Sequence, residues 1–477
     1  MMGDNMNWED DEELNELLEK YENALQTGEP FFFDVDEWSL LIDYYSDDFF
    51  IDKAWEALKY AEQVHFSSTA LLLRKSHLLA MQNKLDEALT VLESIDDFGE
   101  EEYMLGKAEI YSMLDHYEKS IQIYKRILEF TEHPAEIHTS IAMEYENLDD
   151  YKNALKHLEA ALSLKPDSED IMQEVSFFFE ITELNEEAIT FFDKFLDNHP
   201  YNKYAWFNLG LFYSNLELYE KAIESYEFAL AIDEKMPSAY FNIGNAYSQL
   251  NHFRKAIKYY KQTFEYEEPD AVTYSYIAEC YENIGENTEA LSYYNNALDL
   301  DSNFYDAWFG VGRIFARIES PLAAVKYYEK ALSLSPGNTD IAYELGISLL
   351  SSGNYSGSVK YLKMVIEKEK TMVPAWMNYS LAFAIQGDFE KAVEILKESI
   401  SHNPGVAVIF FRLGGYLFNA GKVEEAFFYI EEGLKTDYNS RWELEEYIPE
   451  FLIDNRYLEL LEIYKTADIS GTTDKSN

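Results

Sequence analysis

The sequence predicts an all-α fold, an α-solenoid built from antiparallel helix hairpins. Three observations carry this prediction: apolar residues spaced three or four apart, a repeat interval of 34 residues, and small residues at recurring positions. In residues 203–236, two short helical patterns meet at a turn near residues 216–219, and each has one apolar stripe. One such hairpin cannot bury both stripes alone, so it requires copies of itself on either side.

The copies are traced by two columns of small residues. One lies early in the second helix of each hairpin (helix B), and the other lies twelve residues earlier in the first helix (helix A). Gly210 and Ala222 are one such pair, where we expect two backbones to approach closely. The helix B column is Ala54, Ala88, Ser120, Ala154, Ala188, Ala222, Ala256, Ala290, Ala324, Ser358, Ala392 and Ala426, with every interval 34 residues except the 32 before Ser120. The helix A column is Ile42, Ser76, Ala108, Ala142, Ser176, Gly210, Gly244, Ala278, Gly312, Gly346, Ser380 and Gly414.

This pattern resembles that of tetratricopeptide repeats, which pair a bulky residue, Leu, Gly and Tyr on helix A with Ala, an aromatic residue and Ala on helix B. The resemblance covers residues 35–440, about twelve repeats, and implies a right-handed superhelix. The first two repeats depart from the pattern at Ile42 and Lys75, and the 32-residue step near residues 94–99 shortens one connection. The residues that match best are Trp206, Leu209, Gly210, Tyr213, Ala222, Tyr226 and Ala229.

The two ends of the chain are expected to differ from the repeats. Residues 1–34 are acidic, and Leu14, Leu17 and Tyr21 follow a helical period, so we expect a capping helix on the first repeat. A docking peptide for a basic partner is the alternative. Residues 441–467 are expected to form a degenerate repeat or capping helices, because Leu460 fills the place of the small residue. Residues 468–477 are expected to be a disordered tail.

The charge of the chain limits its partners. Asp and Glu number 89 and Lys and Arg number 38, which gives a net charge of −51. Such a field repels nucleic acid and anionic membrane surfaces and favours protein or peptide partners that are basic or neutral. Much of the charge also serves simply to solvate a long helical surface. With no apolar run long enough to span a bilayer, we expect no membrane insertion and a cytoplasmic location.

No catalytic motif is recognisable, so we expect a protein that is not an enzyme and that needs no cofactor or metal. There is no phosphate-binding loop and no HExxH motif. His133 and His138 are best interpreted as core or surface histidines. Cys280, the single cysteine, is expected to be a structural thiol, since no His is near it in sequence and its surroundings are acidic.

The family resemblance implies a concave wall built from helix A that binds extended peptides or helices. Asn side chains on it can donate to and accept from a peptide backbone, and aromatic side chains add contact area. An Asn at such a position can also be only a solvated residue. The candidate groove residues are Phe207, Asn208, Phe241, Asn242, Asn245, Tyr276, Glu279, Arg313, Tyr343, Asn378, Phe411 and Arg412.

Two known groove types are partly matched. The Asn residues resemble the asparagine ladder of O-linked GlcNAc transferase superhelices, but only Asn208 and Asn242 are adjacent rungs. The clamp that captures chaperone C-termini is disfavoured, because Phe241 stands where that clamp has Lys. The leading hypothesis is a noncatalytic interaction scaffold that binds a peptide or protein segment in its groove. The alternative is a peptide-responsive regulatory sensor that changes superhelical shape, with the irregularity near residues 94–99 either a hinge or a tolerated deletion.

Overall fold

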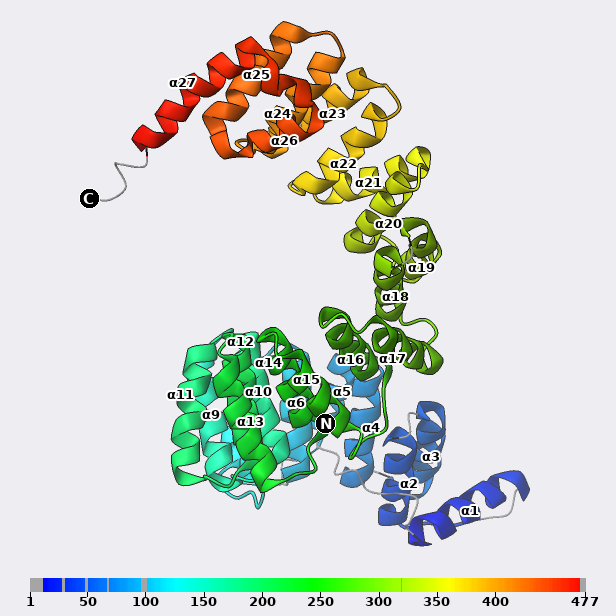
Figure 1. Ribbon diagram of the computed structural model, residues 1–477. Helices are drawn as coiled ribbons and strands as arrows, with labels where there is room; N and C mark the ends of the chain where they lie inside the picture. The colour runs from blue at the N-terminus through cyan, green and yellow to red at the C-terminus, as the bar shows by residue number, and fades with distance from the viewer. Residues whose placement is uncertain are drawn as a thin grey trace. The chain divides into compact units, whose positions relative to one another are not determined.

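The chain folds as an α-solenoid of antiparallel helix hairpins, as the sequence predicts. The computed structural model describes residues 12–27, 31–47, 50–66, 68–95, 101–318 and 320–471. Within these ranges there is no β-strand, and consecutive helices pack pairwise (Figure 1). The chain divides into two compact units, Met1–Asp233 and Glu234–Asn477, and each is taken by itself.

The described residues of the first unit form one leading helix and six hairpins. On the leading helix, Leu14, Leu17 and Tyr21 are buried, and Leu17 and Tyr21 pack with Trp38 and Leu41 of the first hairpin. This is the side of the helix that the apolar period predicts. The elements are α1 (Glu12–Thr27), α2 (Val35–Asp47), α3 (Ile51–Val64), α4 (Thr69–Met81), α5 (Leu85–Glu93), α6 (Glu101–Met113), α7 (Tyr117–Ile127), α8 (Pro134–Asn147), α9 (Tyr151–Leu164), α10 (Glu169–Ile181), α11 (Asn185–Asn198), α12 (Lys203–Asn215) and α13 (Tyr219–Ile232).

In the second unit the described residues form six further hairpins and a terminal group of helices. The hairpin helices are α14 (Pro237–Gln249), α15 (Phe253–Thr263), α16 (Ala271–Asn283), α17 (Asn287–Leu300), α18 (Tyr305–Ile318), α19 (Pro321–Leu334), α20 (Thr339–Ser351), α21 (Tyr355–Lys368), α22 (Val373–Ala384), α23 (Phe389–His402), α24 (Ala407–Asn419) and α25 (Val423–Thr436). The terminal group is η2 (Tyr438–Arg441), α26 (Trp442–Tyr447), η3 (Pro449–Ile453) and α27 (Asn455–Gly471). Leu444, Phe451 and Tyr457 of this group are buried against α24 and α25.

Two expectations about the chain's irregular segments have different outcomes. Helix α27 continues to Gly471, so residues 468–471 are helical and that part of the predicted disordered tail is wrong. Residues 472–477 lie outside the described ranges, as do residues 96–100, which contain most of the shortened connection between α5 and α6. The hinge at residues 94–99 therefore stays a prediction.

The glycines of the helix A column make room for a side chain of helix B, which is a Tyr ring at Gly210, Gly244 and Gly312 and a Leu or Ile side chain at Gly346 and Gly414. A Cβ on Gly210 would lie 2.6 Å from Cε1 of Tyr226, and a Cβ on Gly244 would lie 2.6 Å from Cδ1 of Tyr260. At Gly414 a Cβ would lie 2.6 Å from Cγ1 of Ile430 and 3.2 Å from the carbonyl oxygen of Ala426, so the expected backbone approach occurs there beside a closer side-chain contact. At each of these five glycines, a side chain of helix B therefore occupies the space that the missing Cβ leaves.

Where the structure describes the whole turn inside a hairpin, that turn uses a left-handed residue. Glu217 has φ 59°, and the next turn has Asn251 at φ 59°. At this position Leu218 N–H donates to the carbonyl of Tyr213 at 2.9 Å, which closes helix α12. Later turns use Gly, as at Gly285 with φ 80°. Side chains other than Gly, Asn and Asp are strained in this conformation.

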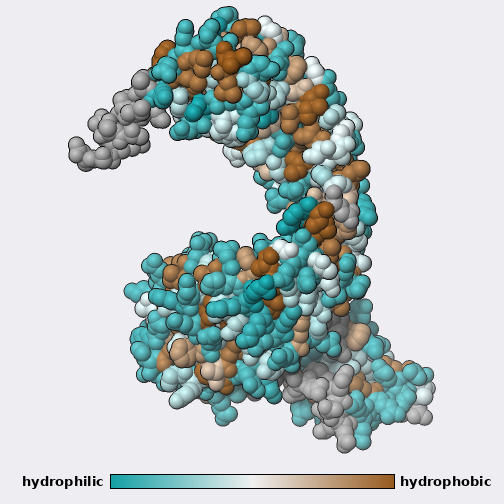
Figure 2. Space-filling view, in the orientation of Figure 1, coloured by the Kyte–Doolittle hydropathy of each residue, from teal (hydrophilic) through white to brown (hydrophobic). Residues whose placement is uncertain are grey.

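Most of the visible surface is hydrophilic. On the face drawn in Figure 2, hydrophobic residues occur in separate small patches among hydrophilic ones. This agrees with a chain in which charged side chains solvate stacked helices.

Candidate functional site

The predicted groove residues lie on helix A of seven hairpins. Phe207 and Asn208 belong to α12 in the first unit. The other ten belong to α14, α16, α18, α20, α22 and α24 in the second unit. The two sets are therefore described separately.

In the first unit, Asn208 connects neighbouring repeats. It is buried, and its Nδ2 donates to the carbonyl oxygen of Met172 on α10 at 3.3 Å. Phe207 lies beside Tyr226, with ring centroids 5.5 Å apart. The sequence suggests Asn208 as a rung for a bound peptide, but its amide nitrogen already stabilises the stacking of α12 on α10.

In the second unit, three aromatic rings form what we call the aromatic platform: Phe241, Tyr260 and Tyr276. The Tyr276 ring stacks on Tyr260 at 5.7 Å and meets the Phe241 ring edge-on at 5.5 Å. Asn245 fixes the platform, because its Oδ1 accepts a hydrogen bond from the Tyr260 hydroxyl at 2.7 Å. Tyr276 is 38% exposed and is the part of the platform open to solvent. Tyr260 comes from helix B, which the prediction of groove residues did not include.

A cavity of about 220 Å³ adjoins the platform, and we call it the acidic pocket. Glu267 and Glu268, both exposed, contribute carboxylates to it. Asp270 also lines it but is engaged at the start of α16, where it accepts from Thr273 N at 2.9 Å and from Thr273 Oγ1 at 2.6 Å. The lining residues are Pro237, Ser238, Phe241, Asn242, Thr263, Glu267, Glu268, Asp270, Val272 and Thr273.

The acidic pocket combines residues that the sequence singled out with residues that it missed. Phe241 and Asn242 are predicted groove residues. Glu267 and Glu268 lie on the connection from α15 to α16, where the helix A period says nothing. The acidic run in residues 265–270 is the sequence signal that points to them.

Arg313 and Glu279 belong to an ion-pair network between α16 and α18. Nη2 of Arg313 lies 3.0 Å from Oε2 of Glu282 and 3.7 Å from Oε1 of Glu279, and Arg317 reaches the other oxygen of Glu282 at 2.6 Å. Burial raises the pKa of Glu279, although the charge of Arg313 opposes this. Arg313 therefore joins neighbouring repeats and is already paired with carboxylates.

The side chain of Tyr294 occupies the space beside Gly310, which holds on α18 the position that Asn208 and Asn242 hold on α12 and α14. A Cβ on Gly310 would lie 2.1 Å from Cζ of Tyr294, whose hydroxyl lies 3.2 Å from Nη2 of Arg313. On α22, Asn378 donates from Nδ2 to the hydroxyl of Tyr343 on α20 at 3.0 Å. These polar groups thus bond across successive repeats.

The last two predicted residues are covered. Phe411 is wholly buried against α25 and the terminal helices, so its placement in an open groove is wrong. Arg412 forms an ion pair with Glu443 of α26 and lies over the Tyr447 ring at 5.1 Å. The terminal helices cover the face of the last hairpin that a further repeat would otherwise cover.

Within the described residues, none of the helices has both the length and the apolar character that crossing a membrane requires. The same residues contain no group of three or more His, Cys, Asp or Glu side chains arranged to hold a metal ion.

Family models match the chain in several places. Models described as tetratricopeptide repeat match residues 135–168, 191–224, 237–269, 281–339 and 343–407, and one described as TPR repeat matches residues 216–251. No curated protein matches the chain.

Similar solved structures include Cut9–Hcn1, a hetero-tetramer of the APC/C, at 12% identity and a TM-score of 0.41, covering 86% of this chain and 92% of that one. The C-terminal part of a TPR repeat-containing protein from Cytophaga hutchinsonii is 17% identical, with a TM-score of 0.43 and coverage of 54% and 99%. YrrB, described as a TPR protein with an unusual peptide-binding site, is 19% identical, with a TM-score of 0.32 and coverage of 41% and 97%.

The family assignment rests on the repeat register, the hairpins and the family models together. Ten of the eleven intervals in the helix B column are 34 residues, and the hairpins of both units follow this register. The matched segments fall on these hairpins. The chain belongs to the tetratricopeptide repeat family.

Proposed function

We propose that the protein is a noncatalytic scaffold that binds a basic, extended segment of a partner protein on the helix A face of the second unit. The observation that carries this proposal is the acidic pocket beside the aromatic platform. A cavity with carboxylates at its rim and an aromatic ring in its wall suits the side chain of Arg or Lys.

The contacts in the acidic pocket contribute a modest binding free energy, and the electrostatic field of the whole chain adds to the attraction of a basic segment. A cation over an aromatic ring contributes about 0.5–2 kcal/mol. An exposed ion pair with Glu267 or Glu268 contributes about 0–1 kcal/mol. The net charge of −51 accelerates the approach of a basic segment and repels acidic ones.

The remainder of the segment is expected to lie along exposed side chains next to the pocket. Asn242 lines the pocket, and an Asn amide can donate to and accept from a peptide backbone without selecting its side chains. Tyr276 offers exposed aromatic area at low entropic cost. Specificity would then come from a basic residue placed at the pocket.

The test uses a fluorescently labelled peptide, Ac-Ala-Arg-Ala-Arg-Ala-NH₂, titrated with the full chain at two salt concentrations. We expect Glu267→Lys/Glu268→Lys to weaken binding about tenfold or more, since it replaces attraction by repulsion at the pocket. The matched control is Glu289→Lys/Asp299→Lys on α17, which makes the same change in net charge at exposed positions outside the pocket.

The variant Phe241→Ala is expected to weaken binding at high and low salt alike, because it removes ring contact rather than charge. Equal weakening by the two double charge reversals would contradict the proposed site and leave only a long-range field. Separately, affinity purification from native lysate with wild type and the same variants identifies the partner protein.

A further inference from the structure

One surface of the first unit has the register of the Arg313 network but lacks its arginines. In the second unit, Glu282 lies four residues after the small residue of helix α16, and it pairs with Arg313 at 3.0 Å and with Arg317 at 2.6 Å. These arginines lie one and five residues after the small residue of α18, the next helix A. Side chains at these three positions therefore meet across successive repeats.

In the first unit the same three positions hold Glu146 on α8 and two apolar residues, Phe177 and Ile181, on α10. Phe177 is 55% exposed and Ile181 is 47% exposed. Met143 on α8 lies one residue after its small residue, Met113 on α6 lies five residues after its own, and both are exposed. We call these four apolar side chains, which come from three successive A helices, the Met–Phe stripe.

The packing of the repeats does not require apolar side chains on this surface. In the second unit, the position after the small residue holds Asn245, Glu279 and Arg313, and each of them contacts a polar neighbour. Met143 and Phe177 hold this position in the first unit and leave much of their area in water. Adjacent exposed apolar side chains mark interaction surfaces, and Met adapts its shape to different partners.

Two carboxylates beside the stripe lack a cation. Glu146 lies three residues after Met143, and Glu174 lies three residues before Phe177, so each is on the same side of its helix as the stripe. Burial and the charge of Glu174 raise the pKa of Glu146 to about 7, and burial and Asp170 raise the pKa of Glu174. Among the residues that the structure describes, no cation lowers the pKa of either carboxylate. A basic group from a partner would relieve this repulsion.

The spacing of the stripe fits an α-helix. Neighbouring helices pack about 8–10 Å apart. Residues i and i+7 of an α-helix are about 10.5 Å apart along its axis. A helix with apolar residues at this interval therefore places one of them on each of α6, α8 and α10.

We propose that the Met–Phe stripe binds a basic amphipathic α-helix of a partner protein. The apolar face of that helix covers the stripe, and its Lys or Arg side chains pair with Glu146 and Glu174, as Arg313 and Arg317 pair with Glu282 in the second unit. The net charge of −51 attracts such a helix. This surface is separate from the acidic pocket, which lies in the second unit and takes an extended segment.

The experiment uses the full chain with ¹³C-labelled Met methyl groups and the peptide Ac-Leu-Lys-Lys-Leu-Leu-Lys-Leu-Leu-Lys-Lys-Leu-Leu-Lys-Leu-NH₂. The sequence has 12 Met residues, and the spectra of Met113→Leu and Met143→Leu identify their resonances. We expect both resonances to shift saturably with peptide. Phe177→Gln should weaken binding about tenfold, because it removes an exposed ring that the helix covers. An analogue with proline as its seventh residue keeps the charge but cannot continue the helix, and it should bind at least tenfold more weakly.

The charge contribution is tested by Glu146→Gln/Glu174→Gln, which should weaken binding about tenfold at low salt. The matched control is Glu87→Gln/Glu187→Gln, which removes two charges from exposed positions on helix B and should stay within about twofold of wild type.

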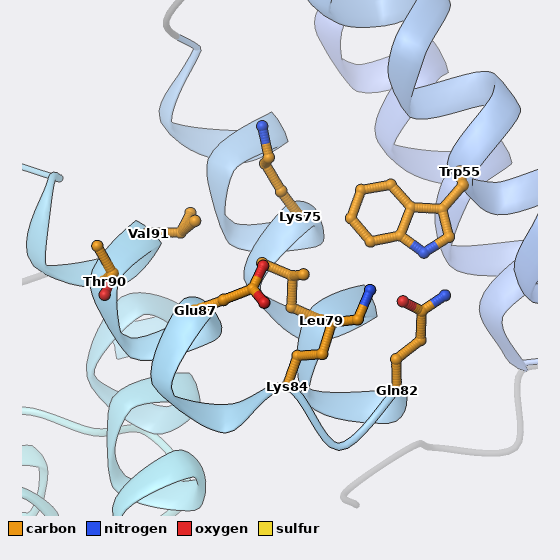
Figure 3. Close-up of a pocket in the computed structure, with 8 residues that line it drawn as sticks. All are labelled: Trp55, Lys75, Leu79, Gln82, Lys84, Glu87, Thr90 and Val91. Carbon is orange, nitrogen blue, oxygen red and sulfur yellow. The ribbon is translucent and has the colours of Figure 1, made fainter.

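The control also tests a second place where the peptide could bind. Glu87 lines a cavity of about 630 Å³ where α3, α4 and α5 meet (Figure 3). The two lysines of that lining are offset, since Lys75 pairs with Glu62 at 2.8 Å and Lys84 shares the lining with Glu87. Binding there would depend on Glu87 and not on Glu146.

Three results would overturn the proposal. The first is that the Met113 and Met143 resonances do not move with the peptide. The second is that the proline analogue binds as tightly as the parent peptide, which would mean that the surface takes an extended segment. The third is that the two double neutralisations weaken binding to the same degree, which would leave only the field of the whole chain.

Discussion

Gly244→Ala tests whether the helix A glycines are required by the rings of helix B. An added Cβ would lie 2.6 Å from both Cδ1 and Cε1 of Tyr260, where ordinary contacts begin at 3.4 Å. The ring is wholly buried and its hydroxyl is bonded to Asn245, so it has little freedom to move. Overpacking of this kind costs about 1–3 kcal/mol. Ala recovers about 1 kcal/mol as the better helix former.

We therefore expect Gly244→Ala to lower the free energy of local unfolding by up to about 2 kcal/mol, the overpacking cost less the gain in helix propensity. The control is Gly106→Ala in α6, where an added Cβ meets nothing within 4 Å. Relief of the glycine entropy should stabilise that helix by about 0.5–1 kcal/mol.

The assay is amide hydrogen exchange in α14 and α15 for Gly244→Ala and in α6 and α7 for the control. Solenoids open repeat by repeat, so a single global transition does not report a local change. If Gly244→Ala slows exchange as Gly106→Ala does, the ring contact does not set the requirement for glycine. A second check is the peptide titration, because displacement of Tyr260 disturbs the aromatic platform.

Three further predictions follow from strain, burial and pairing. Glu217→Gly relieves a left-handed residue at φ 59° and should stabilise the α12–α13 hairpin by about 0.5–1 kcal/mol, measured by amide hydrogen exchange in those two helices, with no gain if the turn is unstrained. Burial raises the pKa of Glu146 to about 7, so its ionised form disfavours folding increasingly as pH rises from 4.5 to 7. Glu146→Gln should accordingly stabilise at pH 8 and not at pH 4, and equal gains at both would refute this. Arg412→Ala leaves Glu443 buried without its partner and should cost about 3–5 kcal/mol in denaturant unfolding of the terminal helices. Arg412→Met/Glu443→Leu should recover most of that loss, and persistence of it would mean that packing dominates.

The hairpin architecture was predictable because one register governs every repeat. Small residues at fixed intervals locate the contact between helix A and helix B, and in the repeats that contain Tyr226, Tyr260 and Tyr328 an aromatic residue at a fixed distance locates the ring that lies on the glycine. The repeat period does not predict which group of helix B contacts each glycine of helix A. The expectation of two backbones in contact holds at Gly414, whereas at Gly210 and Gly244 the ring is the neighbour.

The candidate site was less predictable for two physical reasons. A column of positions says which face a side chain lies on, but not whether a neighbouring repeat already bonds to it, as Met172 does to Asn208. Helix periodicity also carries no information about connections, so Glu267 and Glu268 were missed. At the C-terminal end, the cover over Phe411 depends on helices outside the regular register.

The terminal helices have a consequence for assembly. A stack of hairpins is in principle open-ended, since the last hairpin presents the same kind of apolar face that every earlier hairpin presents to its successor. Such a face invites head-to-tail growth into a fibre when another molecule can continue the stack. Here Leu444, Phe451 and Tyr457 occupy that face, and the Arg412–Glu443 pair fastens α26 to it. The terminal helices thus close the last repeat against polymerisation at that end.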